Sequence, residues 1–437
     1  MKNYDNTKKG FLYKKNKENE KKDGDSLKNV EGSSKATFNL VEVIIIMAVT
    51  ILFGLLIGSF ISYSRFNNDR EVSCSMIRND MIEFSSVYDD LLNDYYGDVD
   101  KEGLLESAIK GMVDYLDDPY SAYIDKTAAL EFNEELEGAF LGIGIEIKSF
   151  DGELPVVNKV YDNSPAMKNG VEVGDVVFKI NDSLIEELTV SEVSNIINES
   201  SLGNEIKLSI LRDGVEMEFL LTISSIEVES VSGYIEKFGD RNIGVIKIST
   251  FAKNSYEQFD KVYKNLDNEE LEYLIIDVRG NTGGYLSVAK NIASLFLDNG
   301  TVIYQRVTEN NVEKVISEKD KKIDVPVLFI IDGSTASAAE VLVSALKENI
   351  SSIVLGVKSY GKGTIQKLHP LSNGSYVKYT SQIWRTSSGV EIEGVGINPD
   401  YVVEQDLLYY EDPVVQNDRQ LQEAYNILIE RMLGYEK

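Results

Sequence analysis

The spacing of hydrophobic and polar residues changes several times along the chain, and each change predicts a different kind of structure. Residues 43–60 (VIIIMAVTILFGLLIGSF) contain no charged side chain. Between residues 76 and 132 apolar residues recur at helical spacing, interrupted at Asp118–Pro119, which predicts two or three short helices. Residues 137–226 carry short apolar runs separated by turn signals, which predicts a compact β-rich module with one short and one longer helix.

From Gly233 onward, strand-like runs alternate with helical runs. NIGVIKIS, LEYLIIDV and VPVLFIID read as strands that are each followed by a helix, and SIVLG reads as a further strand. Such alternation is typical of a mostly parallel sheet in an α/β domain. The segment after SIVLG differs, because Pro370 and the pair Asn373–Gly374 predict a hairpin instead of a helix. The predicted fold class is therefore a multidomain α/β (α+β) protein, with a β-rich module and a mixed α/β core.

The apolar stretch near the N-terminus is long enough to cross a membrane. About 20 apolar residues span a bilayer, so we expect a single transmembrane helix at residues 43–63. Residues 1–37 carry ten lysines and six acidic residues, a net charge of 10 − 6 = +4. The lysine-rich side should stay in the cytoplasm, which places the region after residue 63 outside the cytoplasm, anchored to the cell membrane. A cleaved signal peptide is disfavoured by the long polar lead and the absence of an A-x-A-like site.

Composition removes several classes of function. A formal net charge of −28 argues against nucleic-acid binding, which needs clustered basic residues to neutralise phosphates. Cys74 and His369 are the single cysteine and single histidine of the 437-residue chain. An internal disulfide is thereby excluded and a zinc site is disfavoured, and we expect neither a metal nor another cofactor. Because His369 stands directly before Pro370, hydrolytic chemistry would need a base other than histidine.

With histidine and cysteine set aside, a serine activated by a lysine is the remaining well-attested nucleophile pair. Ser337 lies between a predicted strand and a strong helical run, where free N–H groups favour a developing oxyanion. Lys362 stands between Gly361 and Gly363, which permit the tight, dehydrated packing that lowers a lysine pKa. The turn RGNTGG (Arg279–Gly284) follows a strand and exposes backbone N–H groups. Each feature also has an ordinary interpretation: a helix cap, a solvated loop lysine and a strand-to-helix turn.

The stretch GVKSYGKGT (Gly356–Thr364) approaches the Walker A pattern of nucleotide-binding loops. The match fails at Gly363, which stands where a serine or threonine should bind magnesium. A phosphate-binding loop must also lead into a helix N-terminus, whereas a strand is predicted after Lys362. The sequence therefore disfavours nucleotide hydrolysis.

Taken together, the motifs match one known family. DVRGNTGGYLSVAKNIASLFL, STASAAE and SYGKGTIQ, in that order, resemble the motifs of the C-terminal processing peptidases, also called tail-specific proteases. LLESAIKGMVDYLDDPYSAYID resembles the N-terminal helical segment of that family, and GVEIEGVGINPDYVV resembles its closing motif. The expected parts are a cytoplasmic tail (1–42), a transmembrane helix (43–63), a linker with a helical segment (64–136), a PDZ domain (137–226), a Ser–Lys protease core (227–405) and a C-terminal helical extension (406–437).

The resemblance also implies roles for individual residues. Ser337 would be the nucleophile, Lys362 the general base, and Gln366 the residue that orients the lysine. The implied oxyanion donors are Gly283 and the N–H group of Ala338. The implied carboxylate-binding loop of the PDZ domain, whose backbone amides grip a free C-terminus, is Gly142, Ile143, Gly144 and Ile145. That loop could equally be a simple strand entrance.

The function that follows is a membrane-anchored serine endopeptidase. It would bind the free C-termini of protein or peptide substrates through the PDZ domain and cleave near the C-terminus with the Ser337–Lys362 dyad. A catalytically inactive PDZ scaffold that binds protein tails is the alternative, disfavoured because Ser337, Lys362 and Gln366 are all present. The helical segments at 76–132 and 415–433 are suited to support a homodimer.

Overall fold

The computed structural model describes residues 81–437, apart from 150–153, 186–187, 199, 268–269 and 435–437. The chain forms two compact units, residues 1–100 and 101–437. In the first unit, residues 81–93 are helical. The transmembrane helix expected at 43–63 lies outside the described residues. Within the described part of the chain, none of the helices combines the length and apolar character that a membrane crossing requires.

The second unit begins with two helices and a short strand between them. Helix α2 (Lys101–Asp114) precedes strand β1 (Ala122–Ile124), and helix α3 (Lys126–Glu137) follows it. The side chain of Asp125 caps α3 by accepting hydrogen bonds from the first turn. The helices agree with the apolar spacing of this region, whereas the sequence did not predict β1.

Residues 139–227 form the β-rich module that the turn signals predicted. Strand β2 (Ala139–Gly142) pairs with β9 (Ser224–Glu227), and a second sheet has the order β3-β4-β5-β7-β8 with β6 beside β5. The strands of that second sheet are β3 (Ile145–Lys148), β4 (Val156–Val160), β5 (Val176–Ile180), β6 (Ser183–Leu184), β7 (Glu205–Arg212) and β8 (Val215–Thr222). Helices α4 (Pro165–Asn169) and α5 (Val190–Asn198) complete the module. Its own apolar core holds Ile143, Val157, Val177, Ile206, Leu208, Ile210 and Leu221, all buried.

The region after the β-rich module is organised around a six-stranded sheet with the order β10-β11-β12-β15-β16-β19. Strand β10 is antiparallel to β11, and the other neighbouring pairs are parallel. The strands are β10 (Val231–Phe238), β11 (Arg241–Ile248), β12 (Leu271–Asp277), β15 (Val327–Ile331), β16 (Ile353–Gly356) and β19 (Tyr401–Val402). All five residues of β15 are buried, as expected for a parallel strand that is covered on both faces.

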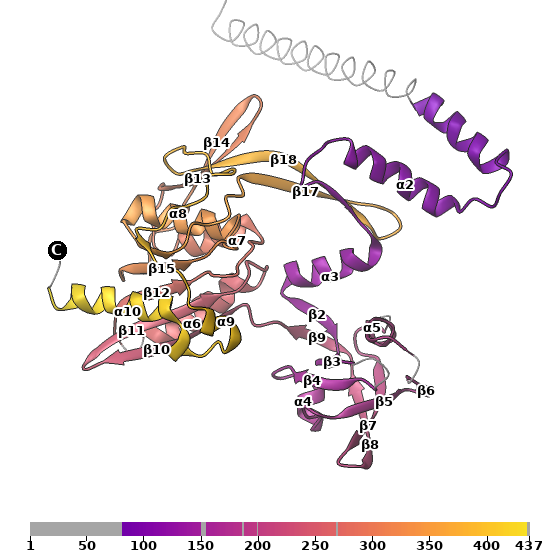
Figure 1. Cartoon of the computed structure of the whole chain (residues 1–437), viewed down its shortest axis with the longest axis horizontal. Helices are drawn as coiled ribbons and strands as arrows, with labels where there is room; N and C mark the ends of the chain where they lie inside the picture. The colour runs from indigo at the N-terminus through magenta and orange to yellow at the C-terminus, as the bar shows by residue number, and fades with distance from the viewer. Residues whose placement is uncertain (1–80, 150–153, 186–187, 199, 268–269, 435–437) are drawn as a thin grey trace, which may run out of the picture. The chain divides into compact units, whose positions relative to one another are not determined.

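Helices cover both faces of this sheet (Figure 1). Helices α6 (Ser255–Asp267), α7 (Leu286–Ala293) and α8 (Ala338–Ile350) share one apolar core with one face of the sheet. Helix α10 (Arg419–Met432) packs on the opposite face, after the short helices α9 (Leu407–Glu411) and η1 (Val415–Asn417). The apolar side of α10 is therefore occupied by its own chain, so the suggested role of residues 415–433 in a homodimer does not use that side.

A separate sheet, with the order β1-β18-β13-β14 and with β17 beside β18, carries the hairpin that the sequence predicted after Lys362. Strands β17 (Thr364–Pro370) and β18 (Tyr376–Thr386) pair antiparallel, which confirms that Lys362 leads into a strand. Strand β18 also pairs with β1 and with β13 (Val302–Thr308), and β13 continues into β14 (Asn311–Ile316). The β13–β14 hairpin was not predicted.

Candidate active site

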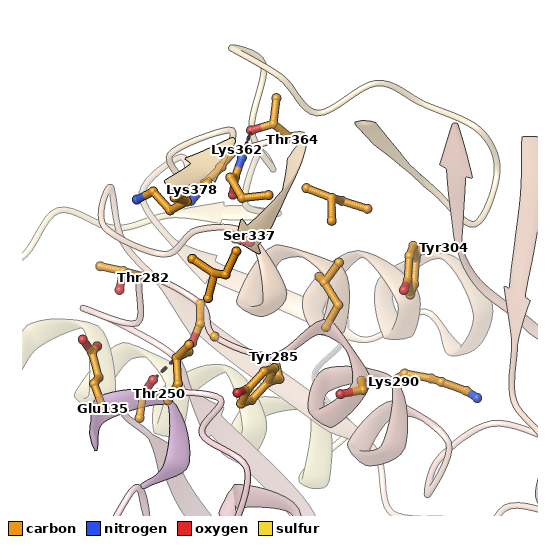
Figure 2. Close-up of a pocket in the computed structure, with 18 of the residues that line it drawn as sticks. Glu135, Thr250, Thr282, Tyr285, Lys290, Tyr304, Ser337, Lys362, Thr364 and Lys378 are labelled. Carbon is orange, nitrogen blue, oxygen red and sulfur yellow. Dashed lines mark hydrogen bonds between the residues drawn. The ribbon is translucent and has the colours of Figure 1, made fainter. Parts of the chain in front are cut away.

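One cleft of about 670 Å³ collects the residues that the sequence marked as chemically important. Ser337, Lys362, Gln366 and Gly283 all line it, as Figure 2 shows for Ser337 and Lys362. The loops that carry Ser337, Lys362 and Gly283 follow β15, β16 and β12, which are neighbours in the parallel part of the sheet, and Gln366 lies just beyond the Lys362 loop in β17. Because parallel strands end at the same edge of a sheet, residues far apart in the sequence meet there.

Ser337 sits at a strained turn at the start of α8. Its backbone has φ 55° and ψ −115°, a conformation that a non-glycine residue adopts at a cost of about 1–3 kcal/mol. The flanking residues hold the turn in place. The N–H of Ala336 donates to the carbonyl of Asn281 (2.9 Å), and the buried Thr335 hydroxyl donates to the carbonyl of Val278 (2.9 Å). The surrounding loops therefore fix the direction in which the side chain of Ser337 points.

Glu340 is a fully buried carboxylate that connects the Ser337 turn to the Lys362 loop. Its Oε2 accepts hydrogen bonds from the N–H groups of Ser337 (2.9 Å) and Lys362 (2.9 Å). Its Oε1 accepts from the N–H of Gly361 (2.8 Å) and the hydroxyl of Ser359 (2.6 Å). The negative charge also lies in the first turn of α8, where the helix dipole favours it. Glu340 thereby holds two separate loops against each other.

Lys362 lies in surroundings that disfavour its charged form. Burial, together with the like charge of Lys378, lowers the pKa of the Lys362 amine, and the charges of Glu393, Asp118 and Glu340 partly offset this effect. A lysine whose pKa falls towards neutrality can accept a proton. The tight packing predicted from the flanking glycines is observed: a Cβ on Gly363 would lie 2.6 Å from the backbone nitrogen of Glu393.

Gln366 lies in β17, at the wall of the same cleft. Its side-chain amide donates to the hydroxyls of Thr364 (2.9 Å) and Thr380 (3.4 Å). The structure thus brings Gln366 into the cleft that holds Lys362, and the expected role in orienting the lysine stays a prediction.

The two expected oxyanion donors lie beside Ser337. A Cβ on Gly283, where φ is +118°, would be 2.9 Å from the Cβ of Ser337 and 3.3 Å from the backbone nitrogen of Ala338. Only glycine permits so close an approach. Within the described residues the N–H of Ala338 has no hydrogen-bond acceptor, whereas the N–H of Gly283 donates to the Asn281 side chain (2.9 Å). The N–H of Ala338, a fully buried residue next to Ser337, is therefore not used by another hydrogen bond, and the oxyanion-donor roles of Ala338 and Gly283 both stay predictions.

The loop that carries Gly283 is also tied to the C-terminal extension. The guanidinium of Arg279 forms buried ion pairs with Asp277 (2.7 Å) and Asp418 (2.7 Å). Asp418 in turn accepts from the N–H of Leu421 at the start of α10 (3.0 Å). Burial alone would raise the pKa of Asp418, but its bonds to Arg279 lower it, so the carboxylate stays charged. The first residue of RGNTGG is thereby fixed by an element near the end of the chain.

The cleft is lined by several cations. Lys290 pairs with Glu318 (2.8 Å) and Arg306 pairs with Glu313 (2.7 Å). Lys378 has no carboxylate partner within the described residues, and its Nζ lies 5.9 Å from the ring centre of Phe132. The positive charge of Lys378 adds to burial in lowering the pKa of Lys362.

The implied carboxylate-binding loop of the β-rich module has the backbone arrangement of an anion site. Ile143 and Gly144 connect β2 to β3, and in the described part of the chain their N–H groups have no acceptor. Their carbonyls accept from Ala166 (2.9 Å) and Tyr161 (3.0 Å), which fixes the loop. Gly142 ends β2 and Ile145 begins β3, an edge strand that pairs with β4 alone among the described residues. Binding of a substrate by this loop stays a prediction.

Sequence reasoning missed Glu340 and Asp418. A signal for Glu340 was present, because Ser337 and Glu340 have the S-x-x-E spacing of a helix capping box. Asp418 had no such signal, since its partner Arg279 lies far away in the sequence.

Comparisons with known proteins agree with this geometry. The model of Peptidase family S41 matches residues 242–403, and the PDZ domain model matches residues 142–223. The N-terminal domain model of the activating protease CtpB matches residues 61–128.

Curated relatives cover most of the chain. It is 33% identical over 319 residues to the carboxy-terminal processing protease CtpA of Bacillus subtilis (strain 168), covering 72% of this chain and 67% of that protein. It is 35% identical over 331 residues to the carboxy-terminal processing protease CtpB of the same organism, covering 74% and 68%. A probable CtpA-like serine protease of Staphylococcus saprophyticus is 31% identical over 391 residues, covering 86% and 77%. These matches confirm the resemblance drawn from the motifs: the chain belongs to the S41 family of C-terminal processing peptidases, and is a serine-type peptidase with a PDZ domain.

Proposed function

We propose that Ser337 is the nucleophile and Lys362 the general base of this peptidase. The observation that carries the proposal is that both residues line one cleft in contrasting environments. Ser337 is held in a strained conformation at the start of α8, and the pKa of Lys362 is lowered chiefly by burial. A nucleophile beside free helix N–H groups and a desolvated lysine are the two parts that a Ser–Lys mechanism needs.

The steps follow from these roles. The neutral amine of Lys362 takes the proton of the Ser337 hydroxyl while the oxygen attacks the carbonyl carbon of the scissile peptide. The oxygen of the tetrahedral intermediate receives a hydrogen bond from the N–H of Ala338. When the C–N bond breaks, the Lys362 ammonium gives its proton to the leaving amine, and the C-terminal fragment departs. Water, deprotonated by Lys362, then hydrolyses the acyl-enzyme and restores Ser337.

Substitution tests the dyad directly. Full-length protein is purified in detergent and incubated with an unfolded protein that has a free C-terminus. We expect Ser337→Ala and Lys362→Ala each to lower kcat by at least about 10³-fold. Ser334→Ala and Lys358→Ala, which change exposed residues of the same two loops, should retain activity. Cleavage at the wild-type rate by either dyad variant would refute the assignment, and no cleavage by the wild type would favour the scaffold interpretation.

We further propose that the PDZ domain captures the C-terminus of the substrate. The free N–H groups of Ile143 and Gly144 support this proposal, as does the open edge of β3, to which an extended peptide can add as a further strand. A substrate with an amidated C-terminus should therefore show a KM about 10–100-fold higher than its free acid, because charge-assisted hydrogen bonds are lost. Equal KM values for the two forms would contradict carboxylate capture.

Membrane anchoring is the third part of the proposal. The uncharged stretch at residues 43–63 and the net charge of 10 − 6 = +4 over residues 1–37 support a single-pass anchor with a cytoplasmic N-terminus. The protein should remain in the membrane fraction after alkaline carbonate extraction and be released by detergent. An added protease should digest the catalytic region in cells whose wall has been removed but whose membrane is intact. Protection of that region would reverse the proposed orientation.

A further inference from the structure

A turn before β1 reaches the loop that carries Lys362. The ring centre of Tyr120 lies 5.2 Å from the Nζ of Lys362, within the distance of a cation–π contact. The Tyr120 hydroxyl donates to Oε1 of Glu393 (3.1 Å), and Oε2 of Glu393 accepts from the N–H of Gly363 (2.6 Å). Tyr120 thus contacts the side chain of Lys362 and, through Glu393, the backbone of the next residue.

The same turn is fixed to the strand that lies beside Gln366. The hydroxyl of Ser121 donates to Asp118 (2.5 Å) and accepts from the backbone N–H of Thr380 (3.1 Å). The hydroxyl of Thr380 accepts from the side chain of Gln366 (3.4 Å). Strand β1 continues this attachment by pairing with β18. The turn at residues 118–121 therefore touches the surroundings of both Lys362 and Gln366.

We propose that Tyr120 is a positioning residue for Lys362: its ring covers the amine, and its hydroxyl, through Glu393, fixes the backbone that follows the lysine. The inference rests on the proposed function, because it assigns a role relative to the base of the Ser–Lys dyad. It also makes the segment before the PDZ domain part of the working active site, although that segment lies more than 200 residues upstream of Lys362.

Two effects of the Tyr120 ring on Lys362 oppose each other. The face of the ring attracts an ammonium group, whereas its bulk keeps water away from the amine. Burial is the largest cause of the lowered pKa of Lys362, so we expect water exclusion to outweigh the attraction. The other charged groups that act on the amine are Lys378, Glu393, Asp118 and Glu340.

Tyr120 itself contributes no charge at working pH. Burial, its hydrogen bond to Glu393 and the neighbouring Tyr360 raise the pKa of the Tyr120 hydroxyl, so the hydroxyl stays protonated. Its influence on Lys362 is therefore through packing and hydrogen bonding.

The experiment measures kcat and KM against pH for the full-length protein and its variants. Tyr120→Ala should lower kcat by about 10–100-fold, because the base loses its alignment. The acidic limb of the pH profile, where activity falls as Lys362 takes a proton, should move to higher pH, because water reaches the amine and its pKa rises. Tyr120→Phe keeps the ring, so its acidic limb should lie at the same pH as that of the wild type, and its kcat should fall less than that of Tyr120→Ala. Tyr123→Ala is the matched control, because it alters β1 in the same segment without contacting Lys362 in the described structure. Its profile should match the wild type.

The outcomes separate this inference from the proposed function. An unchanged kcat and acidic limb in Tyr120→Ala, while Lys362→Ala is inactive, would overturn the role of Tyr120 and leave the dyad intact. Full activity of Lys362→Ala would overturn the dyad itself. Equal effects of Tyr123→Ala and Tyr120→Ala would show that the segment acts only through general stability. If Tyr120→Ala does not fold, Tyr120→Ser replaces it, since serine is also small enough to admit water beside the amine and is common in turns. The same shift is expected, and an unchanged profile overturns the inference.

Discussion

Glu340 offers the sharpest test of how the active site is held together. The carboxylate is fully buried and accepts hydrogen bonds from the backbone N–H groups of Ser337, Lys362 and Gly361 and from the hydroxyl of Ser359. We consider two substitutions. Glu340→Gln keeps the shape of the side chain but removes the charge, and Glu340→Ala removes every acceptor.

The hydrogen bonds give the size of each effect. In Glu340→Gln the amide oxygen can stay at the Oε2 position and keep the bonds from Ser337 and Lys362. The amide nitrogen then faces the N–H of Gly361 and the hydroxyl of Ser359, which already accepts from the N–H of Ile397. If that hydroxyl turns to accept from the amide as well, the Gly361 N–H and the Ser359 O–H both lose their acceptor. An unsatisfied buried donor costs about 1–3 kcal/mol. In Glu340→Ala all three backbone donors lose their acceptor, and we expect a loss of about 4 kcal/mol or more.

Calorimetry and kinetics measure the two consequences separately. For a core of this size, about 1 kcal/mol shifts Tm by about 2–4 °C, so the loss of two donors' acceptor in Glu340→Gln should lower the Tm of this region by at least about 4 °C. Below its Tm, Glu340→Gln should keep much of its kcat, because the bonds to the two dyad loops remain. Glu340→Ala should lose about 10²-fold or more in kcat with a smaller change in KM, because misplacement of the dyad affects the chemical step.

Glu348→Gln supplies the control. Glu348 lies further along α8 and is exposed, and its carboxylate accepts hydrogen bonds from Ser387 and Ser388. This variant should keep the wild-type kcat. The reasoning would be refuted if folded Glu340→Ala retained the wild-type kcat and pH profile, because the link between the two loops would then have no catalytic consequence.

Three further predictions concern the same cleft. Gly283→Ala should abolish most activity, because the new Cβ would lie 2.9 Å from the Cβ of Ser337, the proposed nucleophile. Gly280→Ala is the control: the space around Gly280 is open, so this variant should lose only about 1 kcal/mol of stability and little activity. Asp418→Asn should lower the unfolding free energy by about 2–4 kcal/mol in denaturant titrations, because the buried Arg279 keeps its charge but loses one of its two carboxylate partners. An unchanged midpoint would contradict a stabilising role for the Arg279–Asp418 ion pair. Activity should fall on acidification as Lys362 takes a proton, and Lys378→Met should move that fall to higher pH, since removing a like charge raises the pKa of Lys362; a shift to lower pH would show that the two lysines do not repel each other.

The sequence alone determined the local elements and the order of the chemical motifs. The helical spacing before residue 132 and the alternation of strand-like and helical runs after Gly233 correctly predicted helices and parallel strands. They did so because side-chain periodicity reflects which face of an element is buried. The turn pair Asn373–Gly374 correctly predicted the β17–β18 hairpin, and so removed the phosphate-loop interpretation of Lys362. Ser337 and Lys362 became candidates for the nucleophile and the base because composition left few alternatives and the motifs around them occurred in a recognisable order, and the structure brings both residues to one cleft.

The tertiary structure decided which residues surround Ser337 and Lys362, the proposed dyad. The bond from Glu340 to the Lys362 loop, the contact of Tyr120 with Lys362 and the ion pair of Arg279 with Asp418 each join segments that are separate in the sequence. Local periodicity carries no information about such pairs, because they form only when the sheet brings the ends of its strands to one edge. The strained backbone of Ser337 is likewise invisible in the sequence, since the tertiary contacts of its neighbours, and not its own preference, maintain it.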